Sequence, residues 1–175
     1  MRMFRIGLPL LGALAILIVL SLFTVDEREK ALLLRLGEVV RVHEQAGLYF
    51  KVPFINNVRR FDGRVQTLNP PPERYLTSEK KNVIVEAFVK WRVSDPVQYL
   101  TTMGGDSNRA NMRLEQILKD GLRAEFGKRT IQEVVSGERT IVMESITEKT
   151  EDRARDFGIS IKDVRIKRID LPRDV

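Results

Sequence analysis

The sequence predicts an α+β fold that follows an N-terminal transmembrane helix, and three observations support this prediction. Residues 6–25 contain no charged side chain. Residues 82–93 alternate between apolar and polar side chains, as a half-buried strand does. Between Ala110 and Phe126 the apolar residues recur at the spacing of an amphipathic helix. The order of these patterns predicts antiparallel strands up to about residue 93, helices up to about residue 157, and then a returning strand.

The uncharged run is long enough to cross a membrane. Its 20 residues would make ~30 Å of helix, which matches the hydrocarbon core of a bilayer. A cleaved signal peptide is the alternative. However, the run is longer than the usual apolar core of a signal, and the small residues Ala13 and Ala15 are followed by more aliphatic residues. Residues 1–25 are therefore predicted to be an uncleaved anchor.

The charges that flank this run predict its orientation. Arg2 and Arg5 precede it without an acidic neighbour, whereas residues 26–30 carry mixed charges. Lys and Arg beside a span favour the cytoplasmic side. We therefore expect a single-pass protein of a bacterial inner membrane, with a cytoplasmic N-terminus and a periplasmic body.

Composition excludes some kinds of site. The chain has 175 residues, a formal net charge of +6 and no cysteine. The lack of cysteine excludes disulfides and thiolate metal sites. Basic and acidic residues are interleaved, which favours a solvated mixed surface over a nucleic-acid site.

Short aliphatic and aromatic runs bounded by turn residues predict the first strands, at residues 31–36, 39–42, 47–55 and 64–68. Pro53 makes the third of these an edge or irregular strand. The clearest strand is 82–93, where alternation places on one face Val83, Val85, Ala87, Val89 and Trp91.

Helix signals follow. Asp95 with Pro96 and then Asp106 are N-cap signals for two helices, and residues 130–133 form a capping box for a short third helix. Residues 136–157 predict a long polar helix that Gly158 ends. Its thin apolar stripe comprises Ile141, Ser145, Ile146, Ala154 and Phe157.

The last segment, residues 159–171, alternates like a strand but slips in parity twice. The slips fall between Ile161 and Val164 and between Ile166 and Ile169. An extra residue in one strand of a pair makes such a slip, so two β-bulges are predicted.

Several motifs together resemble the SPFH (band 7) family, which includes stomatins, prohibitins, flotillins, HflK and HflC. They lie at residues 25–31, 35–37, 47–54 and 64–68. Further stretches are most similar to the HflC group, at residues 76–83, 90–93, 104–106, 122–127 and 163–172. The resemblance covers nearly the whole chain. It implies an SPFH1-like β-rich subdomain at residues 26–95 and an SPFH2-like α/β subdomain at residues 96–175.

This resemblance implies a non-enzymatic scaffold without a cofactor. Its expected partners are an HflK-like protein in a hetero-oligomer, an FtsH-like AAA+ protease whose action on membrane proteins it modulates, and anionic membrane lipids. Two departures stand out. Ala46 replaces a usual proline, and the long Ala/Glu-rich helix that closes a ring in the family is absent before the sequence ends at Val175. We therefore expect either a fragment or a shortened member that closes a ring poorly.

Two other functions are alternatives to this one. The first is a stomatin-like organiser of lipid microdomains that acts without HflK, and the second is a membrane-tethered hydrolase. The hydrolase is disfavoured because His43 is the only histidine and Gly47 stands where a zincin helix needs its second ligand. His43 is expected in a surface loop. Gly104, Gly105 and Asp106 lack the lysine of a phosphate loop and are interpreted as a helix break with an N-cap.

Three groups of residues are candidates for contacts, each with an ordinary structural alternative. Membrane contact is predicted for four residues that otherwise belong to a core strand, namely Tyr49, Phe50, Lys51 and Phe54. Anionic lipid or plain solvation is expected for Arg59, Arg60, Arg64, Lys80 and Lys81. A subunit contact, or packing on the chain's own sheet, is expected for Arg139, Ile141 and Glu148.

Overall fold

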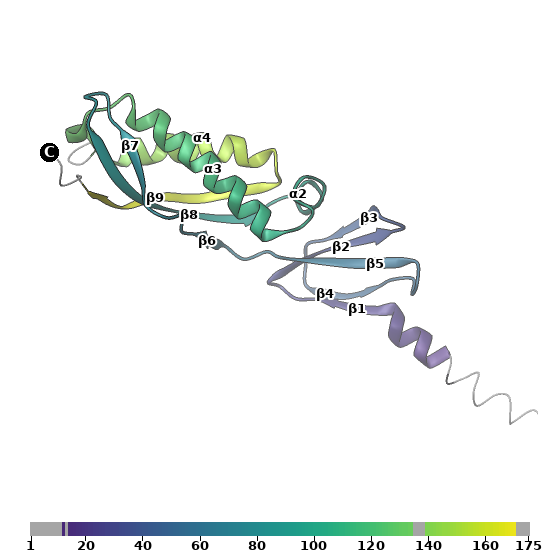
Figure 1. The fold of residues 1–175 in the computed structure, drawn as a ribbon. Helices are drawn as coiled ribbons and strands as arrows, with labels where there is room; N and C mark the ends of the chain where they lie inside the picture. The colour runs from purple at the N-terminus through teal and green to yellow at the C-terminus, as the bar shows by residue number, and fades with distance from the viewer. Residues whose placement is uncertain (1–11, 13, 135–138, 171–175) are drawn as a thin grey trace, which may run out of the picture. The chain divides into compact units, whose positions relative to one another are not determined.

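The computed structural model describes residue 12, residues 14–134 and residues 139–170, and of Arg139 only the backbone. Figure 1 shows its elements. The chain divides into two compact units, Met1–Gly63 and Arg64–Val175. The predicted boundary at residues 95 and 96 differs from this division. The difference arises because β8 (Asn82–Val93) pairs along its length with β9 (Ile159–Asp170), which keeps both strands in the second unit.

The first unit corrects the predicted extent of the apolar helix. Residues 14–21 are helical, but the end of the uncharged run forms strand β1 (Leu22–Val25), which pairs with β4 (Gly47–Phe50). Phe23 and Val25 are buried and Thr24 is exposed, so the alternation of a strand overrides the helix at residues with high strand propensity. Among the described residues no helix is both long and apolar enough to cross a membrane. Residues 1–11 and 13 of the predicted anchor lie outside them.

A three-stranded antiparallel sheet completes the first unit, in the order β3-β2-β5. The strands are β2 (Glu29–Arg35), β3 (Glu38–His43) and β5 (Asn56–Asp62). The predicted β2–β3 hairpin is confirmed, and Leu36 and Gly37 both take positive φ in its turn, as a two-residue hairpin requires. Ala31 and Leu33 pack with Phe23 and Val25 in the core of this unit.

The second unit is built on a sheet with the long strand β8 at its centre. β6 (Gln66–Leu68) and β7 (Glu73–Leu76) pair with one edge of β8, and β9 pairs with the other. All five residues of the predicted face of β8 are buried, and Trp91 is fully inaccessible. The prediction from alternation is therefore confirmed.

Both predicted bulges occur in β9. Its register against β8 shifts at two places, where Lys162 and Lys167 have no partner across the pair. The extra residue at Lys162 restores parity between Ile161 and Val164, so that Ile161, Val164 and Ile166 are all buried. The extra residue at Lys167 does the same for Ile169, which is half-buried.

The helices described after β8 include α2 (Pro96–Met103), α3 (Ser107–Phe126) and α4 (Arg139–Arg155), and residues 131–134 are also helical. The Asp95 carboxylate accepts hydrogen bonds from the Val97 and Gln98 amides of α2, and the Asp106 carboxylate accepts one from the Asn108 amide of α3, so both predicted caps are confirmed. The predicted capping box is also present. The Thr130 amide donates to Glu133 Oε2 at 2.7 Å, and the Glu133 amide donates to Thr130 Oγ1 at 3.3 Å. Figure 1 shows α3 and α4 on the same side of the sheet.

The buried stripe of α4 differs from the predicted one. It consists of Val142, Ile146, Thr150 and Ala154, which follow one another at four-residue spacing. Ile141 is 57% exposed, so its predicted place on the packed stripe is wrong. Val142 takes that place because it lies one turn before Ile146. Residues 135–138, where the predicted helix would begin, lie outside the described residues.

Candidate membrane-contact and subunit-contact surfaces

The first unit carries a group of exposed apolar side chains near the end of its helical segment. We call them the apolar patch, and they are Leu48, Phe50, Val52, Phe54 and Ile55. Phe50 is 71% exposed and Phe54 is 91% exposed. Burying one large apolar side chain is worth ~1.5–3 kcal/mol, so water is a poor environment for two exposed phenylalanines. Gathered apolar exposure of this kind marks a surface that contacts something else.

Backbone strain accompanies the exposure of Phe54. Its φ is 67°, in the left-handed region that non-glycine residues rarely adopt. The surrounding turn is closed by a 2.9 Å hydrogen bond from the Asn56 amide to the Val52 carbonyl oxygen. The turn thus holds a large apolar side chain away from the protein at a cost of ~1–2 kcal/mol.

The helical segment ends beside the apolar patch. Leu22 pairs with Phe50 in the β1–β4 ladder, and the Lys51 amide continues the ladder with a 2.8 Å hydrogen bond to the Ser21 carbonyl oxygen. The preceding residues of the helical segment expose their apolar side chains, namely Leu14, Ile16, Leu17, Ile18, Val19 and Leu20. An exposed apolar helix and the apolar patch therefore adjoin within one unit.

The predicted membrane-contact residues separate into two groups. Phe50 and Phe54 belong to the apolar patch, and half-buried Lys51 lies next to it. Tyr49 points the other way, because successive strand residues face opposite sides. Its ring packs against His43 and Phe23 at centroid distances of 4.0 and 5.8 Å, and its hydroxyl donates to the Gln45 carbonyl oxygen at 2.9 Å. Tyr49 is therefore a packing residue of the first unit.

The expectation of a surface loop for His43 is wrong. His43 ends β3 and is only 7% exposed, because its ring packs against Phe23 and Tyr49. Burial, followed by repulsion from Arg41, lowers the pKa of His43 below its usual value. Its Nε2 atom is buried without a hydrogen-bond partner. Within the described ranges, no group of three or more His, Cys, Asp or Glu side chains is arranged to hold a metal ion.

The other sequence candidates have ordinary structural roles. Gly104 is the left-handed C-cap of α2, and Asp106 caps α3, which confirms the interpretation as a helix break with an N-cap. Arg60 lies 3.7 Å from the Glu29 carboxylate, and Lys81 lies 3.6 Å from that of Glu79. Arg59 is exposed on β5.

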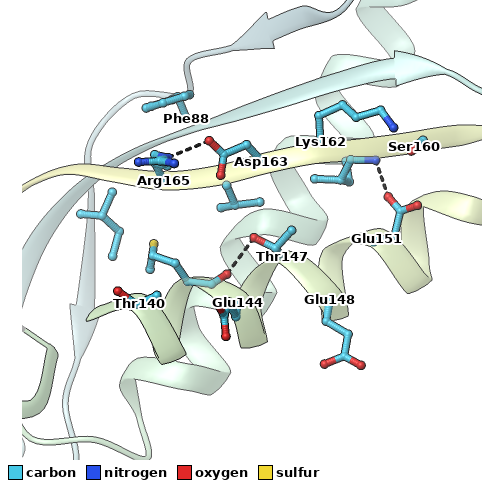
Figure 2. Close-up of a pocket in the computed structure, with 14 residues that line it drawn as sticks. Phe88, Thr140, Glu144, Thr147, Glu148, Glu151, Ser160, Lys162, Asp163 and Arg165 are labelled. Atoms are coloured by element: carbon cyan, nitrogen blue, oxygen red, sulfur yellow. Dashed lines mark hydrogen bonds and ion pairs between the residues drawn. The ribbon is translucent and has the colours of Figure 1, made fainter. Parts of the chain in front are cut away.

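In the second unit, a groove of about 1120 Å³ runs between α4 and β9 (Figure 2). Glu144, Glu148 and Glu151 line its helical side, and residues 160–166 line its strand side. Glu151 Oε2 accepts a hydrogen bond from the Ile161 amide. Across the part of the chain that the structure describes, neither Glu144 nor Glu148 forms an ion pair, and no strand pairs with the outer edge of β9.

The predicted subunit-contact residues lie on or near this groove. Glu148 is exposed at its wall and Ile141 is exposed on the same helix, while the side chain of Arg139 lies outside the described residues. Sequence reasoning missed the groove and the free edge of β9. The signal for the edge was present, since bulges and lysines are devices that protect unpaired edges, and both occur at Lys162 and Lys167.

Comparison with known proteins identifies relatives along the chain. The model of the SPFH domain / Band 7 family matches residues 23–175. A Protein HflC from Haemophilus influenzae is 37% identical over 181 aligned positions, which cover 98% of this chain and 61% of the relative. A Protein HflC from Vibrio parahaemolyticus is 33% identical, over 98% of this chain and 64% of the relative. The Escherichia coli protein named Modulator of FtsH protease HflC is 31% identical, over 91% of this chain and 62% of the relative.

The chain therefore spans about three fifths of the length of these relatives. The resemblance inferred from the sequence motifs is confirmed, both for the family and for the HflC group. The fold agrees, since antiparallel strands are followed by helices and a returning strand. The chain belongs to the SPFH domain / band 7 family.

Proposed function

We propose that this chain is a non-enzymatic, membrane-anchored scaffold that modulates a membrane protease of the FtsH type. The name of the Escherichia coli relative supports a modulating role, and that alignment covers 91% of this chain. The structural observation that carries membrane attachment is the exposed helical segment that ends beside the apolar patch, where the Lys51 amide bonds to Ser21. The proposed location is a bacterial inner membrane, with an anchor that ends at Ser21, before β1, and with the body in the periplasm.

In this proposal the apolar patch lies in the membrane interface. Aromatic side chains favour the headgroup level of a bilayer, and a lysine beside them suits its charged surface. Phe50 and Phe54 would enter the interface, and the burial of Phe54 would offset the strain of its positive φ. The role of Tyr49 in this arrangement is to fix β4 from inside.

A tryptophan placed at position 54 tests the membrane contact. The full chain carrying Phe54→Trp would be reconstituted in vesicles of brominated phosphatidylcholine, where bromine quenches indole only at the bilayer. Trp91 is fully buried and serves as a constant background. We expect a blue-shifted and strongly quenched emission from the new side chain. Met112→Trp, at a position 65% exposed on α3, is the matched control and should not be quenched. Equal emission from Phe54→Trp in brominated and ordinary vesicles would contradict the contact.

We further propose that an HflK-like partner binds along α4 and its groove. The unpaired edge of β9, the free carboxylates of Glu144 and Glu148, and exposed Ile141 support this assignment.

The modulating role is tested by the turnover of a membrane-protein substrate in a bacterium that lacks its own HflC protein. Expression of this chain should change the substrate half-life only when the FtsH-type protease is present. An unchanged half-life would count against the modulating role.

The apolar patch equally favours a second function, that of a lipid organiser that acts without an HflK-like partner. Affinity purification of the chain from detergent-solubilised membranes separates the two functions. Recovery of an HflK-like protein in an amount similar to that of this chain supports the scaffold function. Recovery of the chain alone, with enriched lipid, supports the organiser.

A further inference from the structure

A hollow of about 490 Å³ lies in the first unit at the end of the helical segment. Its lining includes Ser21 at the end of that segment, Phe50 and Val52 of the apolar patch, and the cations Arg35, Arg41 and Lys51. Among the described residues no acidic side chain lines it. Three cations without a carboxylate make the electrostatic potential in this hollow positive, which favours an anion.

Strand geometry explains why two of these cations meet there. Leu33 and Arg35 face the same side of β2, since they are two residues apart. Arg41 is paired directly with Leu33 across the β2–β3 ladder, so it shares that side. Leu33 itself packs in the core with Phe23 and Val25 of β1. The hollow lies where this covered face ends.

The cations of the hollow are not neutralised by the protein. In the described part of the first unit, Lys30 lies 3.3 Å from the Glu44 carboxylate and Arg60 lies 3.7 Å from that of Glu29. No such ion pair is formed there by Arg35, Arg41 or Lys51. Arg35 donates only to the Asn56 side-chain oxygen, at 3.4 Å. Glu38 is opposite Arg35 in the ladder, but it neither lines the hollow nor pairs with the guanidinium.

The rim of the hollow adds a second requirement. Phe50 is 71% exposed and Val52 is 45% exposed, and the helical segment that ends at Ser21 presents aliphatic side chains. An occupant must therefore place an anion against guanidinium and ammonium groups and hydrocarbon against the rim. Inorganic phosphate or a nucleotide would satisfy the first requirement only. A phospholipid satisfies both, because its phosphate and its acyl chains are covalently joined.

We propose that this hollow binds the phosphate-bearing headgroup of an anionic phospholipid, with the acyl chains against the exposed helix and the apolar patch. This inference rests on the proposed membrane attachment. It adds a lipid preference and three residues that carry it, Arg35, Arg41 and Lys51. A phosphate oxygen suits the fork of a guanidinium, and two arginines on one face can share a single phosphate.

The test measures which lipid stays with the protein. The full chain would be extracted with mild detergent from vesicles that contain equal amounts of phosphatidylglycerol and phosphatidylcholine, and its bound lipid would be measured by mass spectrometry. We expect phosphatidylglycerol to be enriched. A basic residue near a membrane surface contributes ~1 kcal/mol, so Arg35→Gln, Arg41→Gln or Lys51→Gln should each reduce the enrichment about fivefold. Arg41→Lys keeps the charge and should retain most of it.

Arg59→Gln is the matched control. Arg59 is an exposed cation in the same unit, but it pairs with Leu32 and therefore faces the other side of the sheet. Its substitution should leave the enrichment unchanged. Equal enrichment in the wild type and in the triple Gln variant, with both proteins still attached to vesicles, would overturn the headgroup site alone. Failure of the wild type to attach to vesicles would instead overturn the proposed membrane function.

A competition experiment separates the lipid from a free anion. Inorganic phosphate at millimolar concentration would be added to the extracted protein. Retention of phosphatidylglycerol supports the lipid site, because the acyl chains add contacts that phosphate lacks. Complete displacement would show a site for small phosphates and would contradict the proposal.

Discussion

The ammonium of Lys149 on α4 lies 2.6 Å from the Glu125 carboxylate on α3 and joins these two helices. Only 5% of the Glu125 side chain is exposed. Lys149 and Ser145 donate to Glu125 Oε2, Ser145 at 3.3 Å. Glu125 Oε1 accepts two hydrogen bonds from Arg129, at 2.9 and 3.0 Å. Burial raises the pKa of Glu125, but the hydrogen bonds from Lys149 and Arg129 lower it more, so its net pKa lies below the usual range.

Replacing Glu125 should destabilise the second unit. Glu125→Ala removes the oxygen that accepts both of these Arg129 hydrogen bonds and the oxygen that accepts from Lys149. Because Lys149 is half exposed and regains water, we expect a loss of about 2 kcal/mol in the free energy of unfolding rather than the full cost of breaking a buried pair. Urea unfolding followed by Trp91 fluorescence measures it, since Trp91 is fully buried in this unit. Glu148→Ala removes an exposed acid from α4 and should change stability by less than ~0.5 kcal/mol. Equal effects of the two substitutions would contradict the role of Glu125.

The buried ring of His43 should make the first unit sensitive to acid. Its pKa is lowered in the folded state by burial and by Arg41, while Phe23 and Tyr49 offer it no negative charge. The unfolded chain therefore binds a proton more readily than the folded chain once the pH falls below ~6.5. The contribution of neutral His43 to the stability of the first unit is fully present above that pH, and it is lost as the pH falls toward the pKa of His43 in the folded state.

A buried cysteine measures this loss in the first unit alone. The chain has no cysteine, and Val25 is 4% exposed, so Val25→Cys reacts with a thiol reagent only when the unit opens. Opening should become more frequent between pH 7 and 5 in this background. His43→Phe, which keeps the aromatic packing but does not titrate, should abolish the increase when compared at each pH. A parallel increase in both proteins would show that His43 is not responsible.

Gly158 allows no side chain. Its φ is 70°, and an added Cβ would overlap the Asp95 carbonyl oxygen and lie 2.7 Å from the Tyr99 nitrogen. Gly158→Ala should therefore cost at least ~2 kcal/mol, because the strain is against backbone atoms that cannot turn away. Gly121→Ala provides a control of opposite sign. Gly121 lies within α3, and its added Cβ would lie at an ordinary 3.7 Å from the Thr150 side chain on α4. The variant should therefore gain up to ~1 kcal/mol of stability from the higher helix propensity of alanine. Urea unfolding of both variants tests the contrast, and a neutral Gly158→Ala would contradict it.

Features set by local chemistry were predictable from the sequence, whereas features set by distant partners were not. The caps at Asp95 and Asp106 and the bulges at Lys162 and Lys167 depend on residues within one or two turns or one strand. The change from helix to strand at Leu22 depends on pairing with β4, which comes more than 20 residues later. The apolar run gave no sign of this, because Phe, Thr and Val occur in both structures.

The candidate surfaces show the same limit. The sequence offers Tyr49 and Phe50 as membrane contacts together, although alternation places them on opposite faces of a strand. Which of the two faces the core depends on His43 and Phe23, which lie on other strands. In α4, the sequence pattern fits a stripe through Ile141 almost as well as one through Val142, and only the packing on β9 and α3 selects Val142. The hollow with Arg35, Arg41 and Lys51 is lined by residues of four strands and of the helical segment, and no single stretch of sequence contains it.

Charge reversal in the groove of the second unit should weaken binding of an HflK-like partner. Glu148 is exposed, lines the groove and forms no ion pair in the described part of the chain. A partner that binds the acidic wall of this groove must be complementary to the Glu148 carboxylate, and Glu148→Lys reverses that charge. We therefore expect about fivefold lower recovery of the partner on co-purification. Asp152→Lys is the matched control, since Asp152 is exposed on the same helix outside the groove. Both variants should unfold at the same urea concentration as the wild type. Unchanged recovery with Glu148→Lys, or an equal loss with Asp152→Lys, would exclude the groove as the contact surface.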